Sequence, residues 1–353
     1  MEWQTDVGTA YDLWMSLHVL HHPSDFGLRR PWAAGVRARL PEPERQVLAE
    51  VTTAMPFPFP WVASLEGEKS AECALEALAA LPAEKRLPAL FILPEMPPEA
   101  AEIWRRVAES GKWDDQDLKK LRSVYARFFA KKGRKFPIED RLRLFANSAE
   151  IGEKYLRALK TYHRVFFAEE EERILPALEN AVNTAAELLE KSGPEQALEK
   201  LTQGLNLPAA LAMKRLVLAP SYWSTPLIVF HRLSPDTGLL VFGARPQGDS
   251  LVPGEEIPTA VMRGLRALDN PTRLRILRYL AERPTSPSQL ARRLRLRLPT
   301  VLHHLHVLRL AGLVSLNLSE GERLYSARRE QLGKVWEVLQ AFLQGEPRQG
   351  GKK

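Results

Sequence analysis

Residues 286–312 read SPSQLARRLRLRLPTVLHHLHVLRLAG, and this stretch decides the fold of the C-terminal part of the chain. It opens on Ser286 with Gln289 three residues later, a pattern typical of a capped helix N-terminus. We therefore predict a short helix over 287–294, a turn over 295–298 and a second helix over 299–310 that ends at Ala311-Gly312. Two helices joined by so short a turn are typical of a helix-turn-helix, whose second helix enters the major groove of DNA.

The spacing of apolar residues separates the two faces of the second helix. Val301, Leu305 and Leu308 recur at three- and four-residue intervals and are expected to pack inward. The residues predicted to lie in or beside the groove are Pro299, Thr300, His303, His306 and Arg309. The residues predicted to contact phosphates are Arg292, Arg293, Arg295 and Arg297, with Arg323 in a following hairpin.

The flanking segments complete a winged helix. Asn270-Pro271 predicts a capped helix that buries Leu274, Leu277 and Leu280, after an earlier helix whose apolar stripe starts at Ile257. Residues 313–327 alternate apolar and polar about a Ser-Glu-Gly-Glu tip, which predicts a β-hairpin, or wing. The last helix carries one wide apolar stripe that suggests a dimer interface. The residues predicted for that interface are Val261, Leu265, Leu332, Val335, Trp336, Leu339 and Phe342.

Charge is divided unevenly along the 353 residues. Residues 257–353 carry 18 Lys and Arg against 7 Asp and Glu, although the formal charge of the whole chain is only +7. Residues 1–256 therefore carry slightly more Asp and Glu than Lys and Arg. A basic module joined to an acidic body is typical of a nucleic-acid binder, so double-stranded DNA is the expected partner.

Residues 1–245 are expected to form a mostly helical domain. The ranges with helical periodicity are 11–22, 42–54, 70–81, 99–110, 115–132 and 138–191, the last with a break near 161–163. Gly193-Pro194 is a predicted helix stop, and the proline alternation at 55–61 argues against helix and central strand. Short β-branched and aromatic runs at 215–220, 226–233 and 238–244 predict a small antiparallel β-sheet with a hairpin.

The predicted fold class is accordingly mainly α. A helical N-terminal domain with a small antiparallel β-sheet spans 1–245, and a linker spans 246–256. A C-terminal winged helix-turn-helix over 257–345 and a disordered tail over 346–353 follow.

Several motifs within 265–327 point to one family. The opening LRALDNPTRLRIL, PTVLHHLHVL in the second helix, AGLV after it and GERLY in the wing resemble the winged-helix repressors of the ArsR family. The resemblance implies DNA binding, repression and a homodimer on a pseudo-palindromic operator. The chain departs from the family at Leu302, where serine usually precedes the first histidine. LWMSLHVL and LAPSYWSTPLIV resemble a long N-terminal extension found in some of these regulators, which implies no known activity.

Metal sensing, a familiar activity in that family, is not expected here. Residues 286–294 and 330–344, which would hold the ligands, contain no cysteine, histidine or aspartate. His303, His304 and His306 are too close along one helix to converge on a metal. His18 and His22 lie one turn apart and lack an obvious third ligand.

Other classes of protein find no support in the sequence. It contains no P-loop, dinucleotide-binding glycine motif or G-x-S-x-G, so we expect neither a cofactor nor an enzyme. No apolar run approaches the roughly 18 residues of a membrane helix, and the N-terminus lacks the basic region of a signal peptide. The single Cys73 sits among apolar residues, is expected in the core, and fits a reducing cytoplasm.

The expected function is that of a cytoplasmic, homodimeric repressor of ArsR type. Because the usual metal sites are missing, a non-metal small-molecule effector is expected to act through residues 1–245. The aromatic and histidine side chains at 18–26, 55–61 and 221–223 could line its pocket. The alternative is a protein-interaction or enzymatic body that retains a winged helix for contacts with another protein.

Overall fold

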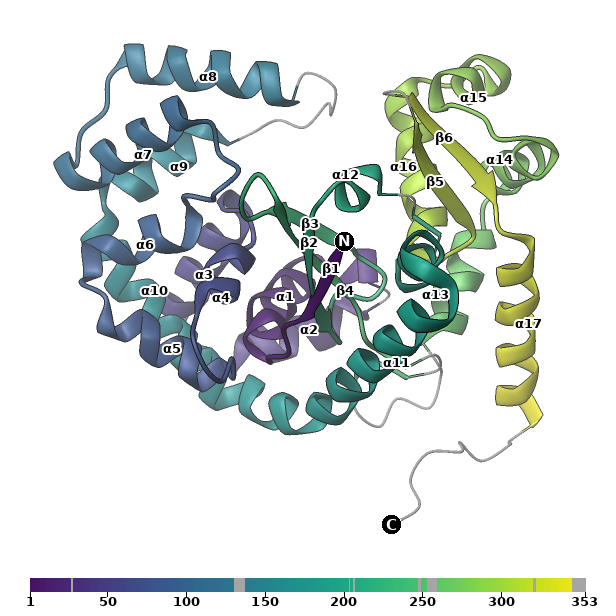
Figure 1. Cartoon of the computed structure of the whole chain (residues 1–353), viewed down its shortest axis with the longest axis horizontal. Coiled ribbons are helices and arrows are strands. Elements are labelled where there is room, and N and C mark those ends of the chain that lie inside the picture. The colour runs from purple at the N-terminus through teal and green to yellow at the C-terminus, as the bar shows by residue number, and fades with distance from the viewer. Residues whose placement is uncertain are drawn as a thin grey trace.

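The computed structural model describes residues 1–26, 28–129, 137–202, 204–205, 207–246, 249–252, 259–319 and 322–344. The fold is mainly α, as the sequence predicts, and 67% of it is helical. Figure 1 shows a group of helices on one side, a small sheet in the middle and the C-terminal elements on the other side. The predicted tail over 346–353, together with 247–248 and 253–256 of the predicted linker, lies outside the described residues.

Most helices of the body follow the apolar periodicity of the sequence. They are α1 (Ala10–His21), α2 (Arg30–Ala38), α3 (Glu42–Ala54), α4 (Phe59–Ser64), α5 (Ala71–Ala80), α6 (Ala83–Phe91), α7 (Pro98–Ser110), α8 (Asp115–Phe129), α9 (Ile138–Ala146), α10 (Ser148–Tyr162), α11 (Ala168–Leu201) and α12 (Pro208–Leu211). The expectation that prolines exclude helix from 55–61 is wrong for its last residues, because α4 begins at Phe59. Pro60 fits the first turn, where a backbone N–H needs no helical partner.

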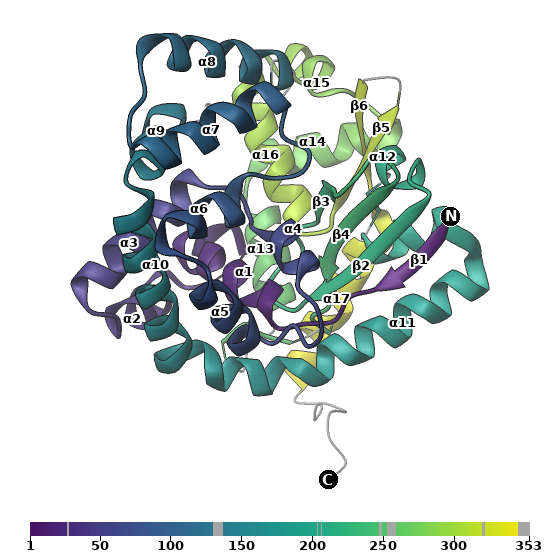
Figure 2. The same ribbon diagram turned by 60° about the vertical axis from the view of Figure 1, so that its left-hand side comes forward.

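The long helical stretch over 138–191 is divided differently from the prediction. The chain breaks at Asn147, between α9 and α10, whereas the break expected near 161–163 is a π-helical turn, His163–Phe167, that leads directly into α11. The predicted stop is confirmed, since Gly193 has the non-helical angles φ 72° and ψ 171°, which end the first part of α11, and a second helical part then runs to Leu201. Figures 1 and 2 both show α11 curving past the sheet toward the C-terminal elements.

The sheet of the body has four strands in the order β1-β2-β4-β3. They are β1 (Glu2–Thr5), β2 (Arg215–Ser221), β3 (Val229–Arg232) and β4 (Thr237–Gly243). The predicted hairpin is confirmed, because β3 and β4 are antiparallel and pair Val229 with Val241. The sheet as a whole is mixed, which corrects the prediction, because β1 and β4 both run parallel to β2. The short, mostly exposed β1 shows no alternation that could have predicted it.

A buried carboxylate fastens α1 to the end of β2. Asp12 accepts hydrogen bonds from Ser221 Oγ (2.6 Å) and from the backbone N–H groups of Tyr222 (3.0 Å) and Trp223 (2.8 Å). Burial raises the pKa of Asp12 to about 6. Three donors on one carboxylate hold the end of β2 against α1, and the helices and the sheet also share one apolar core, so we call these parts the body.

The C-terminal elements surround a second core. They are α13 (Thr259–Leu268), α14 (Pro271–Glu282), α15 (Pro287–Leu294), α16 (Leu298–Leu310), β5 (Val314–Ser319), β6 (Glu322–Ala327) and α17 (Arg329–Gln344). Ile276, Leu290, Leu305 and Tyr325 meet in this core. The wing strands are antiparallel, as predicted, and pair Val314 with Ala327. The core therefore fixes the direction in which α16 presents its outer face.

Candidate nucleic-acid interface

Side-chain caps start the two helices that precede α16. The predicted capping box on α15 is confirmed: Ser286 Oγ accepts from the Gln289 N–H (3.4 Å), and Gln289 Oε1 accepts from the Ser286 N–H (3.2 Å). Asn270 Oδ1 accepts from two backbone N–H groups at the start of α14, which confirms the other predicted cap. Local sequence signals thus determine where these helices begin.

The inner face of α14 differs from the prediction. Leu277 and Leu280 are buried as expected, but Leu274 is 50% exposed and Ile276 takes the inward position instead. Leu277, Leu280 and Ile276 already form a contiguous stripe, so Leu274 falls outside it. Ile257 lies outside the described residues.

A left-handed residue makes the turn between α15 and α16. Arg295 has φ 53° and ψ 41° and ends α15, and α16 begins at Leu298, one residue earlier than predicted. Non-glycine residues adopt this conformation at a small energetic cost. The turn places the outward arginines next to the N-terminus of α16.

The two faces of α16 are as the periodicity predicts. Val301, Leu305 and Leu308 are fully buried. Of the residues predicted for the groove, Pro299, Thr300 and His303 are exposed, whereas His306 and Arg309, one or two turns further on, are half-buried. The N-terminal half of α16 is therefore the part that can enter a groove.

Two leucines extend this outer face and were not among the predicted contacts. Leu298 and Leu302, four residues apart, are 41% and 37% exposed. Exposed apolar side chains on a recognition helix can pack against thymine methyl groups. The sequence signal for this contact was that Leu298 and Leu302 lie four residues apart and outside the buried stripe of Val301, Leu305 and Leu308.

His304 is held neutral on the flank of α16. Burial lowers its pKa, and nearby His303 and Arg273 lower it further. The His303 and His304 ring centroids are 5.8 Å apart. His304 therefore adds no charge to the surface at neutral pH.

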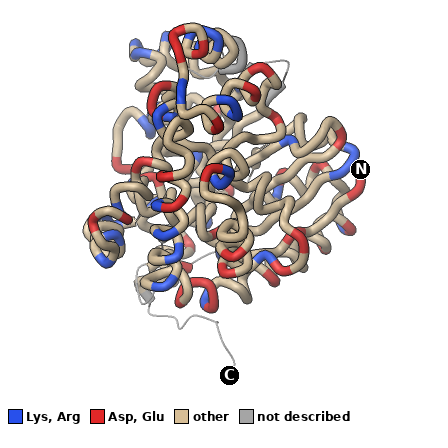
Figure 3. Tube along the Cα trace, turned by 90° about the vertical axis from the view of Figure 1, so that its left-hand side faces the viewer, with Lys and Arg blue, Asp and Glu red and all other residues tan. Residues whose placement is uncertain are grey.

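The arginines predicted for phosphate contacts surround the start of α16. Arg292, Arg293, Arg295 and Arg297 are all exposed, and the Arg293 guanidinium lies 5.4 Å from the centre of the Tyr279 ring. Across the body face in Figure 3, by contrast, acidic and basic residues intermingle. The basic group beside α16 suits a polyanion.

The wing is tied to the start of α15. The Thr285 N–H donates to the Tyr325 carbonyl (2.9 Å), and the Tyr325 N–H donates back to the Thr285 carbonyl (3.1 Å). Arg323, half-buried, lies on the same strand two residues away. These two backbone hydrogen bonds therefore set the position of the wing strand that carries Arg323 relative to the start of α15.

The residues predicted for a dimer interface fall into three groups. Val261 is buried within the chain, so it does not face outward. Leu332, Val335, Leu339 and Phe342 are half-buried. Trp336, 59% exposed, and Leu265, 40% exposed, leave an apolar area open on α17 and α13.

A cavity of about 590 Å³ opens in the body. Two of the three predicted segments line it, through His18, His22 and Phe57, whereas Tyr222 and Trp223 of the third are buried elsewhere. Its other lining residues include Trp14, Met55, Phe91, Glu95, Tyr125, Arg141, Tyr155, Phe230 and His231.

Polar groups stand at the wall of this body cavity. His231 Nδ1 lies 2.6 Å from Glu95 Oε1, and His231 Nε2 is buried with no hydrogen-bond partner among the described residues. Burial lowers the pKa of Arg141 to about 10, so its guanidinium stays charged. A mostly apolar cavity with a few polar groups is the usual form of a small-molecule site.

Within the described part of the chain, no group of three His, Cys, Asp or Glu side chains could hold a metal ion. His18 and His22 stack instead, with ring centroids 4.3 Å apart. None of the described helices is long and apolar enough to cross a membrane. Cys73 is half-buried on α5, so it lies less deep than predicted.

Comparison with known proteins identifies the class of the C-terminal part. A family model described as a helix-turn-helix domain matches residues 268–317, from the last residue of α13 into β5. No curated protein and no solved structure matches the chain. The chain thus carries a helix-turn-helix domain, a class of domain that binds DNA in transcription regulators.

Replacing Leu305 with alanine should destabilise this domain by about 2–5 kcal/mol, because it leaves a cavity behind α16. Leu302→Ala, on the same helix and exposed, is the matched control and should change stability by no more than about 0.5 kcal/mol. Urea unfolding followed by circular dichroism measures both. Equal losses of stability in the two variants would contradict the assignment of Leu305 to the buried face of α16 and of Leu302 to its exposed face.

Proposed function

We propose that this protein is a cytoplasmic transcription repressor of ArsR type and not an enzyme. The observation that carries the proposal is the arrangement at the start of α16. Exposed Thr300 and His303 lie on a helix with a fully buried opposite face, beside a group of exposed arginines. Arginines would hold phosphates and fix the register, while the outward side chains of α16 would contact base edges.

The alternative, a winged helix used for protein contacts, predicts different behaviour toward DNA. Phosphate contacts release counterions, so the affinity of a DNA binder falls steeply with salt. A protein-binding winged helix would show little affinity for DNA at any salt concentration. Binding to fragments selected from random-sequence DNA therefore separates the two functions.

Base and phosphate contacts are expected to respond differently to mutation. His303→Ala should cost about 1–3 kcal/mol on the selected sequence and little on random DNA. Arg295→Ala should weaken both about equally and reduce the log–log salt slope by about one. Fluorescence anisotropy across a salt series measures both quantities. Wild-type binding by His303→Ala would show that α16 is turned differently in the groove.

We also propose a homodimer on a pseudo-palindromic operator. A two-fold dimer would place two copies of α16 in successive major grooves, with half-sites about one turn apart. The exposed Trp336 and Leu265 supply apolar surface that a second copy could cover. Val261 takes no part, because it is already buried.

Trp336→Glu should convert the dimer to a monomer without unfolding it, because the indole is mostly exposed in one chain. Sedimentation velocity should give twice 39.9 kDa for the wild type and 39.9 kDa for this variant. Glu337→Gln, the exposed neighbour, is the control and should stay dimeric. A monomeric wild type would overturn the dimer proposal.

The signal is proposed to be a non-metal small molecule that binds in the body cavity. The mostly apolar lining favours an apolar ligand, and His231 Nε2 together with Arg141 favours one that carries an acidic or hydrogen-bond-accepting group. Such a ligand would change DNA affinity only through its different affinities for two arrangements of the dimer.

Thr52→Trp should fill the cavity and abolish stabilisation by such ligands. Thr52 lines the cavity from α3, and Gln46→Trp, on the same helix but exposed, is the matched control. Thermal-shift titrations with 1-naphthoate and 1-naphthol should raise the Tm of the wild type and of the control only. Stabilisation by zinc, and by neither organic compound, would contradict the proposed kind of signal.

A further inference from the structure

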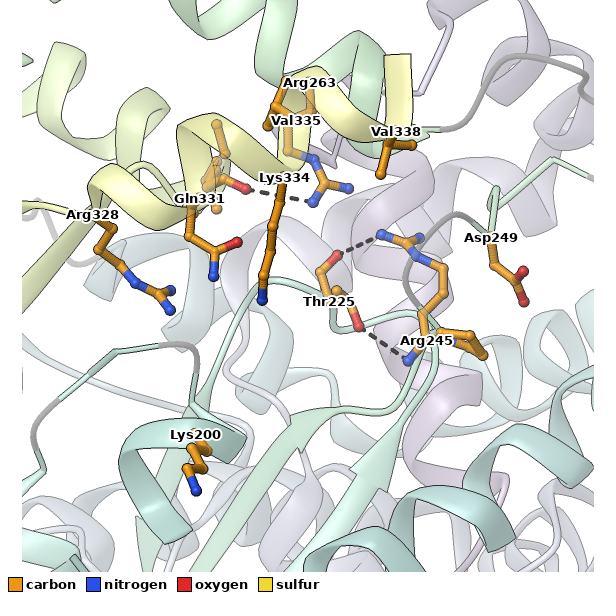
Figure 4. A pocket seen from close by; sticks show the side chains of 14 residues that line it. Lys200, Thr225, Arg245, Asp249, Arg263, Arg328, Gln331, Lys334, Val335 and Val338 are labelled. Carbon is orange, nitrogen blue, oxygen red and sulfur yellow. Dashed lines mark hydrogen bonds between the residues drawn. The ribbon is translucent and has the colours of Figure 1, made fainter. Parts of the chain in front are cut away.

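A second cavity, of about 390 Å³, lies where the body meets the winged helix. Figure 4 shows its wall, formed by α11, the segment after β2, the loop after β4, α13, the end of α16 and α17. Its basic side chains are Lys200, Arg245, Arg263, Arg328 and Lys334. Asp249 is the one carboxylate among the described lining residues.

Two of these arginines are built into the wall. Arg245 is buried, and its Nη2 donates to the Thr225 carbonyl (3.0 Å) while its guanidinium lies 5.9 Å from the centre of the Tyr222 ring. Its Nη1 is buried and meets no hydrogen-bond partner in the described structure. One donor of Arg245 is therefore unpaired in the described structure, beside the cavity that Arg245 helps to line.

Arg263 joins the two halves of the chain. Its Nη2 donates to the Phe26 carbonyl of the body (3.3 Å), and its Nη1 donates to the Leu310 carbonyl at the end of α16 (3.4 Å). Its Nε is buried without a partner among the described residues. Arg263 therefore contacts the body, the recognition helix and the cavity.

Both guanidinium groups stay charged at neutral pH. Burial lowers the pKa of Arg245 to about 10 and that of Arg263 to about 9, and the Arg245 charge lowers the pKa of Arg263 further. Among the described residues, no carboxylate lies within ion-pair distance of either arginine, although the charges of Asp249 and Asp12 raise the pKa of Arg245 slightly. Buried charges are costly when unpaired, so the cavity is better suited to an anion than to an apolar ligand.

We propose that this cavity binds the phosphate group of a small molecule and thereby fixes the winged helix against the body. Lysines and arginines line the cavity from α11, α13, α17 and the loop after β4. In Figure 4, Arg245, Arg263 and Lys334 extend toward a common space, whereas Lys200 lies further away, so the first three could hold a tetrahedral dianion. Arginine forks match the oxygens of a phosphate group. The volume suits a phosphorylated metabolite rather than a polymer.

The position of Arg263 gives the site a regulatory consequence, and this part rests on the proposed function. An anion on Arg263 and Arg245 would stabilise one placement of α16 relative to the body. If DNA binding requires the same placement of α16, the anion would raise the affinity for DNA. If DNA binding requires a different placement, the anion would lower that affinity.

Anion binding is tested on the full chain with pyrophosphate and inorganic phosphate, against sodium chloride at equal ionic strength. Pyrophosphate at ten times its dissociation constant should raise the Tm by about 2–4 °C. The double variant Lys200→Gln/Lys334→Gln removes two exposed cations and should weaken binding at least tenfold by calorimetry. Lys191→Gln, exposed on α11 and away from the cavity, is the control and should bind like the wild type. Equal binding by all three proteins, or none by the wild type, would overturn the proposal.

DNA itself is the other source of phosphate groups. In phosphate-free buffer the double variant should bind DNA like the wild type, and a loss of affinity there would show that DNA phosphates occupy the cavity and overturn the proposal. With wild type, pyrophosphate should change DNA affinity at least threefold more than chloride does at equal ionic strength, and no difference would overturn the coupling. Absence of DNA binding in every buffer would instead overturn the proposed function and leave anion binding standing.

Discussion

The burial of one face of α16 is the constraint on which the rest of the C-terminal part depends. Val301, Leu305 and Leu308 leave water together, so the helix has a single orientation on its core. That orientation turns Thr300 and His303 outward and brings the end of the helix to Arg263. The surface offered to DNA and the contact with the body therefore follow from the same packing.

Polar groups act beside a shared apolar core to determine how the parts of the molecule meet. Asp12 holds the sheet to α1 through three buried donors, and Arg263 holds the end of α16 to the body through two carbonyls. Such bonds are directional, so they fix a relative position that apolar contact alone would leave free to slide. The contact between the body and α16 depends on the buried cation Arg263, which also lines the basic cavity. An anion bound in that cavity would therefore act on the placement of the winged helix.

Sequence reasoning succeeded where the cause was local. The capping residues Ser286 and Asn270 marked helix starts correctly, and the apolar spacing in α16 separated its faces. It failed for the N-terminal strand, because the partner strand β2, with which it pairs in parallel, lies more than two hundred residues away. It also placed Leu274 on the inner face of α14, a position that Ile276 takes instead.

The sequence by itself determined the class of the C-terminal domain, the capped starts of α14 and α15 and the buried face of α16, because caps and periodicity act over a few neighbouring residues. The tertiary structure alone decided the mixed sheet and the basic cavity between the body and the winged helix. Arg245 and Arg263 carry no sequence signal, since their importance arises from losing water beside Thr225, Phe26 and Leu310. Burial and pairing across the chain are properties of the packed molecule, and no local pattern encodes them.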